Sequence, residues 1–214
     1  MQFGVDEAGK GPVLGSMFAA AVRADPTVLP TGIDDSKNLA PARREGLADQ
    51  LRADDRVDIA VAEVPPARVD DPETDMNTLT VAAQAEALSG VVCDGDAGVV
   101  DAGDTDATRF GRRVADRIEG DLSITAEHGA DEAYPLVGAA SVLAKVRRDA
   151  HVTTLSAEYP ETEVGSGYPS DPTTRAFLRE YVAEHGDIPP CARRSWSTSQ
   201  EVLAAAEQSA LSEF

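Results

Sequence analysis

The chain has 214 residues, and 38 acidic against 19 basic residues give it a formal net charge of −19 at pH 7. This length accommodates one sizeable core with a helical appendage and is short for two full domains. The charge excludes capture of nucleic acid by the surface as a whole, and it is typical of a halophilic protein, whose acidic surface works where salt screens repulsion.

The lengths of the apolar runs and the number of cysteines argue against a membrane or secreted protein and against a disulfide-rich protein. No run of apolar residues reaches the ~18 residues of a membrane span, and the first residues lack the pattern of a signal peptide. The two cysteines, Cys93 and Cys191, are too few for a disulfide framework and lack metal-ligand spacing. We therefore expect a cytoplasmic monomer with free thiols and no membrane partner.

The first predicted strand ends on two carboxylates, and a glycine turn follows. In residues 2–12, QFGVDEAGKGP, a β-prone run precedes Asp6 and Glu7, and Gly9-Lys10-Gly11 comes next. Adjacent carboxylates raise each other's pKa, so a divalent cation such as Mg²⁺ or Mn²⁺ explains their placement. The glycines let the backbone approach phosphate or sugar oxygens closely. Without a ligand, the same residues predict a solvated acidic pair before a hairpin turn.

The next residues predict the beginning of an α/β fold. Residues 13–22 are apolar and predict a second strand antiparallel to the first, and alternation over 57–64 predicts a third strand. Between these strands, a proline starts a helix predicted over 41–53. Ser36 and Lys37 lie in the loop before this helix, where they are either a loop with a capping serine or phosphate contacts.

The opening pattern of strand and acid recurs in the middle of the chain. A helix predicted over 78–89 leads to a short strand over 98–101, which ends on Asp101. Two neighbouring strands of an α/β sheet then each deliver an acid to the same edge, where ligands of open sheets commonly bind. The recurrence therefore predicts that Asp101 lies near Asp6 and Glu7.

The second half of the chain alternates helices with polar segments. A helix over 105–119 carries four arginines, and a fifth strand is predicted over 122–126. A polar loop that contains Asp131 then precedes a helix over 137–151, which contains Lys145. We expect the small residues at the start of this helix to allow close packing on the sheet.

The last quarter of the chain is predicted to be helical, with one rigid loop. The turn-rich loop over 164–172 displays Tyr168, which either packs on the domain or stacks on a sugar or base. Helices are predicted over 172–185 and 198–211. Between them, residues 193–196, RRSW, form a basic patch beside the only tryptophan.

Five blocks of sequence span most of the chain. They are DEAGKGP at 6–12, DDSKNL at 34–39, VVDAGD at 99–104, AEHGADEAYPLVGAASVLAKVRRD at 126–149 and GSGYPSDP at 165–172. In this order and spacing they resemble ribonuclease HII in its archaeal form. The resemblance implies an RNase H-like α/β fold, with a mixed five-stranded sheet flanked by helices and a C-terminal helical part. We expect a catalytic domain over 1–155, a helical part over 156–207 and a tail over 208–214.

The resemblance also implies roles for residues at the matching positions. The metal-binding catalytic acids are Asp6, Glu7, Asp101 and Asp131. The residues that recognise a ribonucleotide 2′-hydroxyl are Gly9, Lys10, Gly11 and Tyr168, and those that line the substrate groove are Ser36, Lys37 and Lys145. At Lys10 the family more commonly has arginine; lysine is a point charge, which weakens a bidentate phosphate contact but leaves the backbone contacts unchanged.

The activity that the resemblance implies is that of an endonuclease for RNA–DNA hybrids and for ribonucleotides embedded in duplex DNA. It would hydrolyse the RNA strand and cut on the 5′ side of the ribonucleotide with two ions of Mg²⁺ or Mn²⁺, leaving 5′-phosphate and 3′-hydroxyl ends. The alternatives are a structure-selective DNA nuclease of the same fold and a non-catalytic hybrid-binding clamp partner. The glycine turn and Tyr168 argue against the first. The four acids argue against the second, because without metal they repel phosphate.

The end of the chain suggests a protein partner. Gln208, Leu211 and Phe214 resemble the peptide that binds the replication sliding clamp, although only one terminal aromatic residue is present. As the end of an amphipathic helix, the same residues need no partner. Both interpretations stay open, and the first predicts that the sliding clamp binds this tail.

Overall fold

The structure, a computed structural model, describes residues 1–33 and 39–211, with side chains up to residue 208. It divides into two compact units. The first comprises residues 1–8, 17–63 and 75–148, and the second comprises 9–16, 64–74 and the chain from 149 onward. Each unit therefore combines segments that are far apart in the sequence. Domain limits at residues 155 and 207 stay a prediction, because compactness alone does not show which parts fold independently.

The first unit is built on a mixed five-stranded sheet with the strand order β3-β2-β1-β4-β5. The strands are β1 (Gln2–Ala8), β2 (Met17–Ala24), β3 (Asp58–Val64), β4 (Ala97–Asp101) and β5 (Ser123–Glu127). β1 pairs antiparallel with β2 and parallel with β4, and β4 is parallel to β5. The sheet expected from the sequence is thus confirmed, and β1 with its two acids is its central strand.

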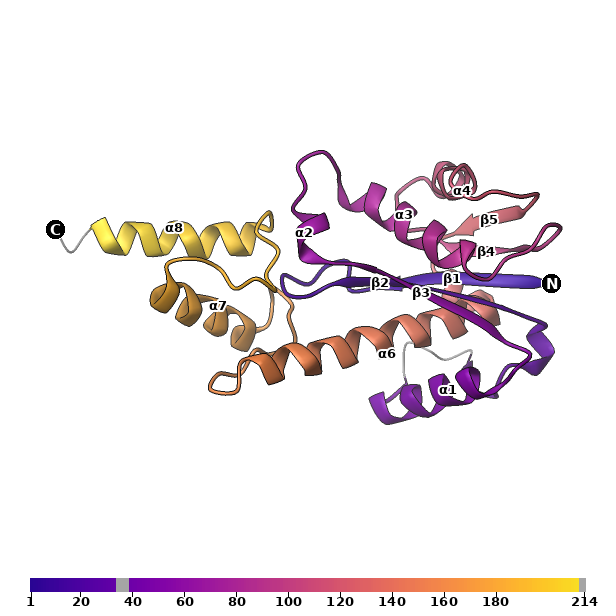
Figure 1. The fold of residues 1–214 in the computed structure, drawn as a ribbon, viewed down its shortest axis with the longest axis horizontal. Coiled ribbons are helices and arrows are strands. Elements are labelled where there is room, and N and C mark those ends of the chain that lie inside the picture. Colours follow the sequence, from indigo (N-terminus) through magenta and orange to yellow (C-terminus); the bar gives the residue numbers. More distant parts are fainter. Residues whose placement is uncertain (34–38, 212–214) are drawn as a thin grey trace. The chain divides into compact units, whose positions relative to one another are not determined.

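Helices cover both faces of this sheet. Figure 1 shows α3 and α4 on one side and α1 with the first part of α6 on the other. The helices are α1 (Pro41–Ala53), α3 (Met76–Ser89), α4 (Ala107–Ala115) and α6 (Pro135–Glu158), with the short elements η1 (Pro26–Val28), α2 (Pro66–Val69) and α5 (Ala130–Ala133). Because both faces are covered, β2 can be apolar almost throughout, and its residues 17–22 are fully buried.

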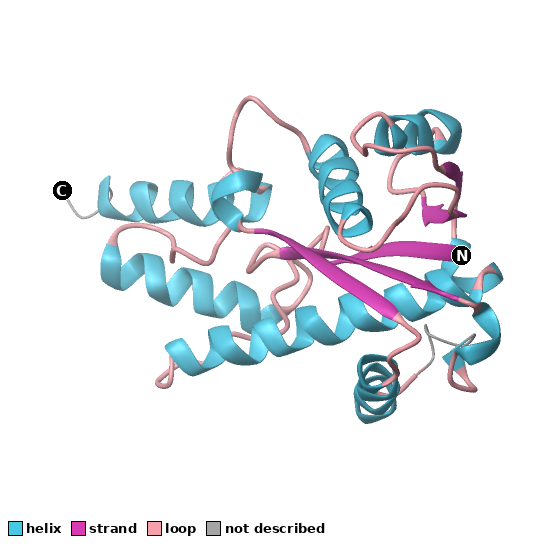
Figure 2. Cartoon of the chain, turned by 45° about the vertical axis from the view of Figure 1, so that its right-hand side comes forward, coloured by secondary structure: helices cyan, strands magenta, loops and turns pink. Residues whose placement is uncertain are grey.

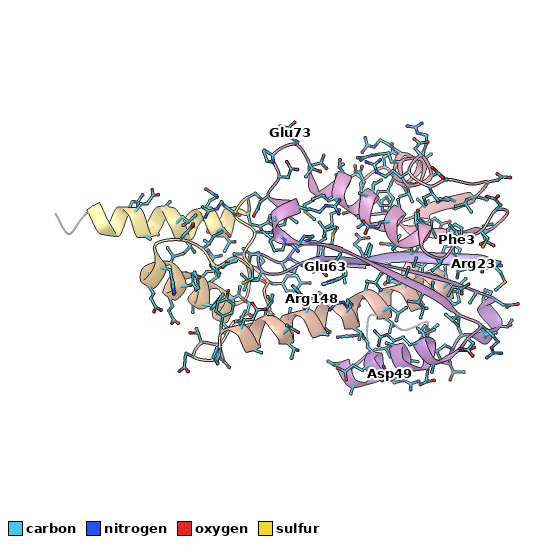
Figure 3. The ribbon with its side chains drawn as sticks, viewed as in Figure 1. Phe3, Arg23, Asp49, Glu63, Glu73 and Arg148 are labelled. Carbon is cyan, nitrogen blue, oxygen red and sulfur yellow. The ribbon has the colours of Figure 1, made fainter. Side chains whose placement is uncertain are left out.

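The sheet and α6 pack backbone against backbone. A Cβ atom built on Gly4 of β1 would lie 2.2 Å from the carbonyl carbon of Leu136, so only glycine fits at this position. Ala139 and Ala140, which follow in α6, are small and fully buried. On the same strand Phe3, labelled in Figure 3, is 2% exposed and belongs to the core. This close approach lets a polar side chain of α6 reach the acids at the end of β1.

The second unit is mainly helical. Its helices α7 (Pro172–His185) and α8 (Ser197–Leu211) lie side by side (Figure 2). Phe177 of α7 packs in an apolar cluster that also contains Val13 and Leu14. The N–H groups of Val13 and Leu14 donate to the carbonyl oxygen of Gly167 at 2.8 and 3.2 Å. The segment that follows β1 is therefore part of this unit's core.

Most predicted elements are present, and the differences lie at their ends. The helices predicted over 41–53 and 172–185 have these bounds. The strand predicted over 13–22 was placed too early: β2 begins at Met17, because the residues before it are packed in the second unit. The arginine-rich helix is shorter than predicted and ends at Ala115. Among the described helices, none is both long enough and apolar enough to cross a membrane.

Candidate active site

Three acids meet at one edge of the sheet in the first unit. Val5 of β1 pairs with Val100 of the parallel strand β4, so Asp6 and Asp101 follow at the same level of the edge. Asp6 is 6% exposed. Burial raises the pKa of Asp6 well above its usual value, and the negative charges of Glu7 and Asp101 raise it further. The structure therefore brings together the acids that the strand pattern predicted.

Asp6 and Glu7 are held from opposite faces of the sheet, because adjacent residues of a strand alternate in direction. The hydroxyl of Ser141, on α6, donates a hydrogen bond to Asp6. On the other face, the Gln84 amide, on α3, donates from Nε2 to Glu7 Oε2 at 2.6 Å and to the Asp101 carbonyl oxygen at 2.9 Å. Both partners of this nitrogen are acceptors, which fixes the orientation of the amide. Gln84 thus joins the acidic ends of β1 and β4.

The fourth acid is linked to the other three through the start of α5. The N–H of Ala130 donates to Asp101 Oδ1 at 2.7 Å, and the next residue is Asp131, which is 5% exposed. Lys145 Nζ lies 3.9 Å from Asp131 Oδ2 and donates to Ser141 Oγ at 2.7 Å. Because Ser141 also binds Asp6, these contacts connect all four predicted acids within the first unit.

The donor chemistry of this edge fits a hard divalent cation. All four acids offer oxygen, which Mg²⁺ and Mn²⁺ prefer. In addition, Gln84 Oε1 is buried and has no hydrogen-bond partner within the described residues. A buried acceptor without a donor costs about 1–3 kcal/mol, so such an atom marks a place where a polar group binds.

The side chains of the four acids do not converge on one point as the ligands of a metal ion do. In the part of the chain that the structure describes, no three His, Cys, Asp or Glu side chains are placed to hold an ion together. The hydrogen bonds explain this arrangement, since Glu7 and Asp101 face N–H donors of Gln84 and Ala130. Convergence of the four acids on a metal therefore needs rotation of side chains, and their assignment as ligands stays a prediction.

In the second unit, the glycine turn is held by the residues expected to form a basic patch. Arg193 donates from Nη2 to the Gly9 carbonyl oxygen at 2.5 Å and from Nη1 to the Lys10 carbonyl oxygen at 2.8 Å. Trp196 Nε1 donates to the Gly11 carbonyl oxygen at 3.2 Å. Arg193 lies beside the tryptophan, as predicted, but its exposed fraction is 0%. It is a buried anchor of the turn.

Tyr168 lies close to this turn. A Cβ atom built on Gly11 would be 3.9 Å from Tyr168 Cε1, and the tyrosine is 40% exposed. Its loop is fixed by Asp171, whose carboxylate accepts from the N–H and hydroxyl of Ser166 at 2.6 and 2.7 Å and from the N–H of Thr173 at 2.9 Å. These hydrogen bonds lower the pKa of Asp171 to about 2. The structure thus brings the turn and the tyrosine together, as the resemblance implied.

The remaining predicted residues are only partly described. Ser36, Lys37 and Phe214 lie outside the described residues. Gln208 is exposed near the end of α8, and Leu211 is the last residue of that helix. Their expected roles in binding the substrate or the clamp stay predictions.

Gln84 and Arg193 contact predicted site residues, and the sequence indicated neither of these contacts. Gln84 is a polar residue in an alanine-rich helix, which is a weak signal, and its partner Glu7 is 77 positions away. Arg193 stands next to a second arginine, Arg194, which pairs with Asp187, so the two look alike in sequence. Only the tertiary structure separates the buried arginine from the exposed one.

Comparison with known proteins decides the family. Residues 3–199 match ribonuclease HII. The chain belongs to the ribonuclease HII family. It is 65% identical over 214 residues to the ribonuclease HII of Haloarcula marismortui, and the match covers 100% of both chains. This relative comes from a halophile, which agrees with the strongly acidic composition.

Two solved structures have the same fold. The ribonuclease H2 of Pyrococcus horikoshii OT3 superposes with a TM-score of 0.88 at 36% identity, covering 97% of this chain and 99% of the other. The ribonuclease HII of Archaeoglobus fulgidus, solved as a complex with PCNA, superposes with a TM-score of 0.83 at 36% identity. This match covers 94% of this chain and 96% of the other. The chain is therefore a type 2 ribonuclease H, an endoribonuclease for RNA–DNA hybrids with the RNase H-like fold that the resemblance implied.

Proposed function

We propose that this ribonuclease HII also cuts duplex DNA on the 5′ side of an embedded ribonucleotide, by two-metal-ion hydrolysis that leaves 5′-phosphate and 3′-hydroxyl ends. The observation that carries the chemical part is the meeting of Asp6, Glu7 and Asp101 at the ends of β1 and β4, with Asp6 buried and its pKa raised. Carboxylates that oppose each other's ionisation favour a divalent cation between them.

The four acids would hold Mg²⁺ or Mn²⁺, since these ions prefer oxygen ligands of this kind. Such ions supply an activated water and stabilise the leaving oxygen when they are bound. Only the ionised form of Asp6 serves as a ligand, so cation binding acts against the raised pKa of this group. Lys145 lies near Asp131 and hydrogen-bonds Ser141, and its positive charge offsets part of the repulsion among the acids.

Reading of the ribonucleotide is assigned to the second unit. The 2′-hydroxyl both donates and accepts hydrogen bonds and is what tells a ribonucleotide from a deoxyribonucleotide. The backbone of Gly9-Lys10-Gly11 offers donors at close range, and Gly9, with φ 87°, has a conformation that favours glycine. Tyr168 is exposed enough to stack on the sugar of the same nucleotide.

The experiment for this proposal compares three duplexes: an RNA–DNA hybrid, a DNA duplex with one ribonucleotide, and the same duplex in DNA alone. Each is incubated with the protein in molar KCl with Mg²⁺, Mn²⁺ or EDTA. We expect a metal-dependent cut on the 5′ side of the single ribonucleotide and no cut of the DNA control. Cleavage of the DNA control would favour the structure-selective DNA nuclease. Cleavage of the hybrid alone would remove the embedded ribonucleotide from the substrates.

A second proposal concerns the tail. The Archaeoglobus fulgidus relative was solved with PCNA, and Gln208 of this chain is exposed. We propose that Gln208, Leu211 and Phe214 bind a sliding clamp. A pull-down with immobilised clamp should retain the full-length protein and lose a chain that ends at Glu207. Equal retention of both chains contradicts this proposal.

A further inference from the structure

Arg193 is a buried cation that binds the backbone of the segment after β1. Its side chain is fully buried. Besides the Gly9 and Lys10 carbonyl oxygens, it donates from Nε to the Gly15 carbonyl oxygen at 3.0 Å. The Trp196 ring lies below the guanidinium, 4.9 Å from its central carbon. A buried charge is stable only when it is paired or hydrogen-bonded. The carbonyl oxygens of the turn are among the partners that stabilise the Arg193 guanidinium.

The direction of these hydrogen bonds determines which face of the turn carries its donors. Three consecutive carbonyl oxygens, those of Gly9, Lys10 and Gly11, accept from Arg193 or Trp196. No described peptide bond is cis, and a trans peptide points its C=O and its N–H in opposite directions. The N–H groups of Lys10 and Gly11 therefore point away from Arg193. A sugar hydroxyl that accepts from these N–H groups must approach from the side opposite Arg193.

The anchor is itself held in place within the same unit. The N–H of Arg193 donates to the Val13 carbonyl oxygen at 2.8 Å, and the Ser199 hydroxyl donates to the Arg193 carbonyl oxygen at 2.8 Å. Val13 in turn donates to Gly167, the residue before Tyr168. The turn and the tyrosine loop are therefore joined through one short backbone path next to Arg193.

We propose that Arg193, supported by Trp196, is a positioning residue that holds the donors of the Gly9-Lys10-Gly11 turn toward the ribonucleotide. The proposal rests on the proposed function of this turn. Lysine keeps the charge but has a single ammonium group on a flexible stem, so it cannot replace a fork that binds three carbonyl oxygens. Loss of Arg193 should therefore weaken discrimination between ribonucleotide and deoxyribonucleotide, and it should leave the chemistry of the acids unchanged.

The test measures kcat and KM on a duplex with one ribonucleotide, and the inhibition constant of the all-DNA duplex as a competitor. The ratio of this inhibition constant to KM reports discrimination. For full-length Arg193→Lys in molar KCl with Mg²⁺, we expect KM to rise about tenfold, the loss typical of a charge-assisted hydrogen bond. The inhibition constant and kcat should change little, so discrimination falls about tenfold.

Two further variants separate positioning from folding. Arg194→Lys is the matched control, because Arg194 is the next residue and its side chain pairs with Asp187; it should behave as wild type. Trp196→Phe keeps an aromatic ring at this position and removes the hydrogen bond to Gly11. It should shift discrimination in the same direction by about threefold, and it decides the question if Arg193→Lys does not fold.

A Gly9→Ala variant distinguishes the two levels of the proposal. If Gly9→Ala loses discrimination while folded Arg193→Lys and Trp196→Phe keep it, the positioning role is wrong and the role of the turn stands. If Gly9→Ala keeps wild-type discrimination, the turn does not recognise the ribonucleotide. The proposed positioning role of Arg193 is then wrong as well. Lower thermal stability or kcat with unchanged discrimination marks Arg193 as merely structural and overturns the proposal.

Discussion

The acidic edge of the first unit and the glycine turn of the second unit hold charge in opposite ways. At the acidic edge, Asp6 is buried near two other acids, its pKa is raised, and the neighbouring Gln84 has an unpartnered oxygen within the described residues. In the turn, Arg193 is buried with its guanidinium bonded to three carbonyl oxygens. The acids of the edge thus repel one another, which favours a cation, whereas the hydrogen bonds from Arg193 hold the turn in one conformation.

This difference suggests a division of labour. A site that gains stability when a ligand binds is expected where metal chemistry takes place, because binding to the folded state shifts the folding equilibrium. A site that must distinguish one hydroxyl group needs donors fixed in advance. Changes at the edge should therefore alter cleavage and metal response, and changes near the turn should alter selectivity. The following predictions test that separation.

The largest effect is expected for Asp6→Asn. Loss of this carboxylate should reduce cleavage by at least about 1,000-fold, since it removes a proposed metal ligand. Thermal unfolding in EDTA should occur at a higher temperature than in wild type. The pKa of Asp6 in the folded state lies above its unfolded value, so this group stabilises the fold while protonated, and that contribution is lost as pH rises.

The matched control is Asp49→Asn, an exposed aspartate on α1 that Figure 3 labels. It should change neither the rate of cleavage nor the unfolding temperature in EDTA. Near-native cleavage by Asp6→Asn would remove Asp6 from the metal site.

A smaller effect is expected for Gln84→Leu. This change removes the donor that joins Glu7 to the end of β4. Residues that orient metal ligands typically contribute about 10- to 100-fold to metal affinity or activity, and we expect a loss near the lower value. Calorimetric titration with Mn²⁺ measures the affinity apart from activity. Gln50→Leu, on the exposed part of α1, is the control; equal affinity of both variants would contradict a role for Gln84.

The smallest effect is expected for Asp171→Asn in the tyrosine loop. The pKa of Asp171 is lowered to about 2 by hydrogen bonds from Ser166 and Thr173. A lowered folded-state pKa gives stability that is present above the unfolded value of 3.8 and is lost as pH falls through about 2. The difference in unfolding temperature between wild type and variant should therefore be largest above pH 4 and shrink toward pH 2. A difference in unfolding temperature that stays constant from pH 4 to pH 2 would contradict this prediction.

The acidic edge could be predicted from the sequence better than the contacts around it. A strand that ends on an acid is a local pattern, so Asp6, Glu7 and Asp101 could be placed together from the order of residues alone. Asp131 stands in a polar loop without such a pattern, and only the resemblance to ribonuclease HII indicated it. The contacts of Gln84 with Glu7 and of Arg193 with the turn join residues 77 and about 180 positions apart. No local pattern encodes such pairings, because they depend on how α3 and the C-terminal segment pack.

The same reason explains the error in the second strand. Residues 13–15, Val-Leu-Gly, carry no polar side chain, which suits a strand as well as a buried loop. Their N–H groups find partners at Gly167 and Cys191 instead of in the sheet. Apolar composition predicted burial correctly and could not say in which core the segment is buried.

The most direct test of the division of labour is duplex binding by Asp101→Asn and Gly9→Ala. Each protein is titrated with fluorescent duplexes that contain one ribonucleotide or none, in molar KCl with Mg²⁺, and cleavage is followed in parallel. We predict that Asp101→Asn fails to cleave and still prefers the ribonucleotide duplex, whereas Gly9→Ala loses that preference. If Asp101→Asn loses the preference as completely as Gly9→Ala does, the acidic edge and the turn do not act separately, and the account is contradicted.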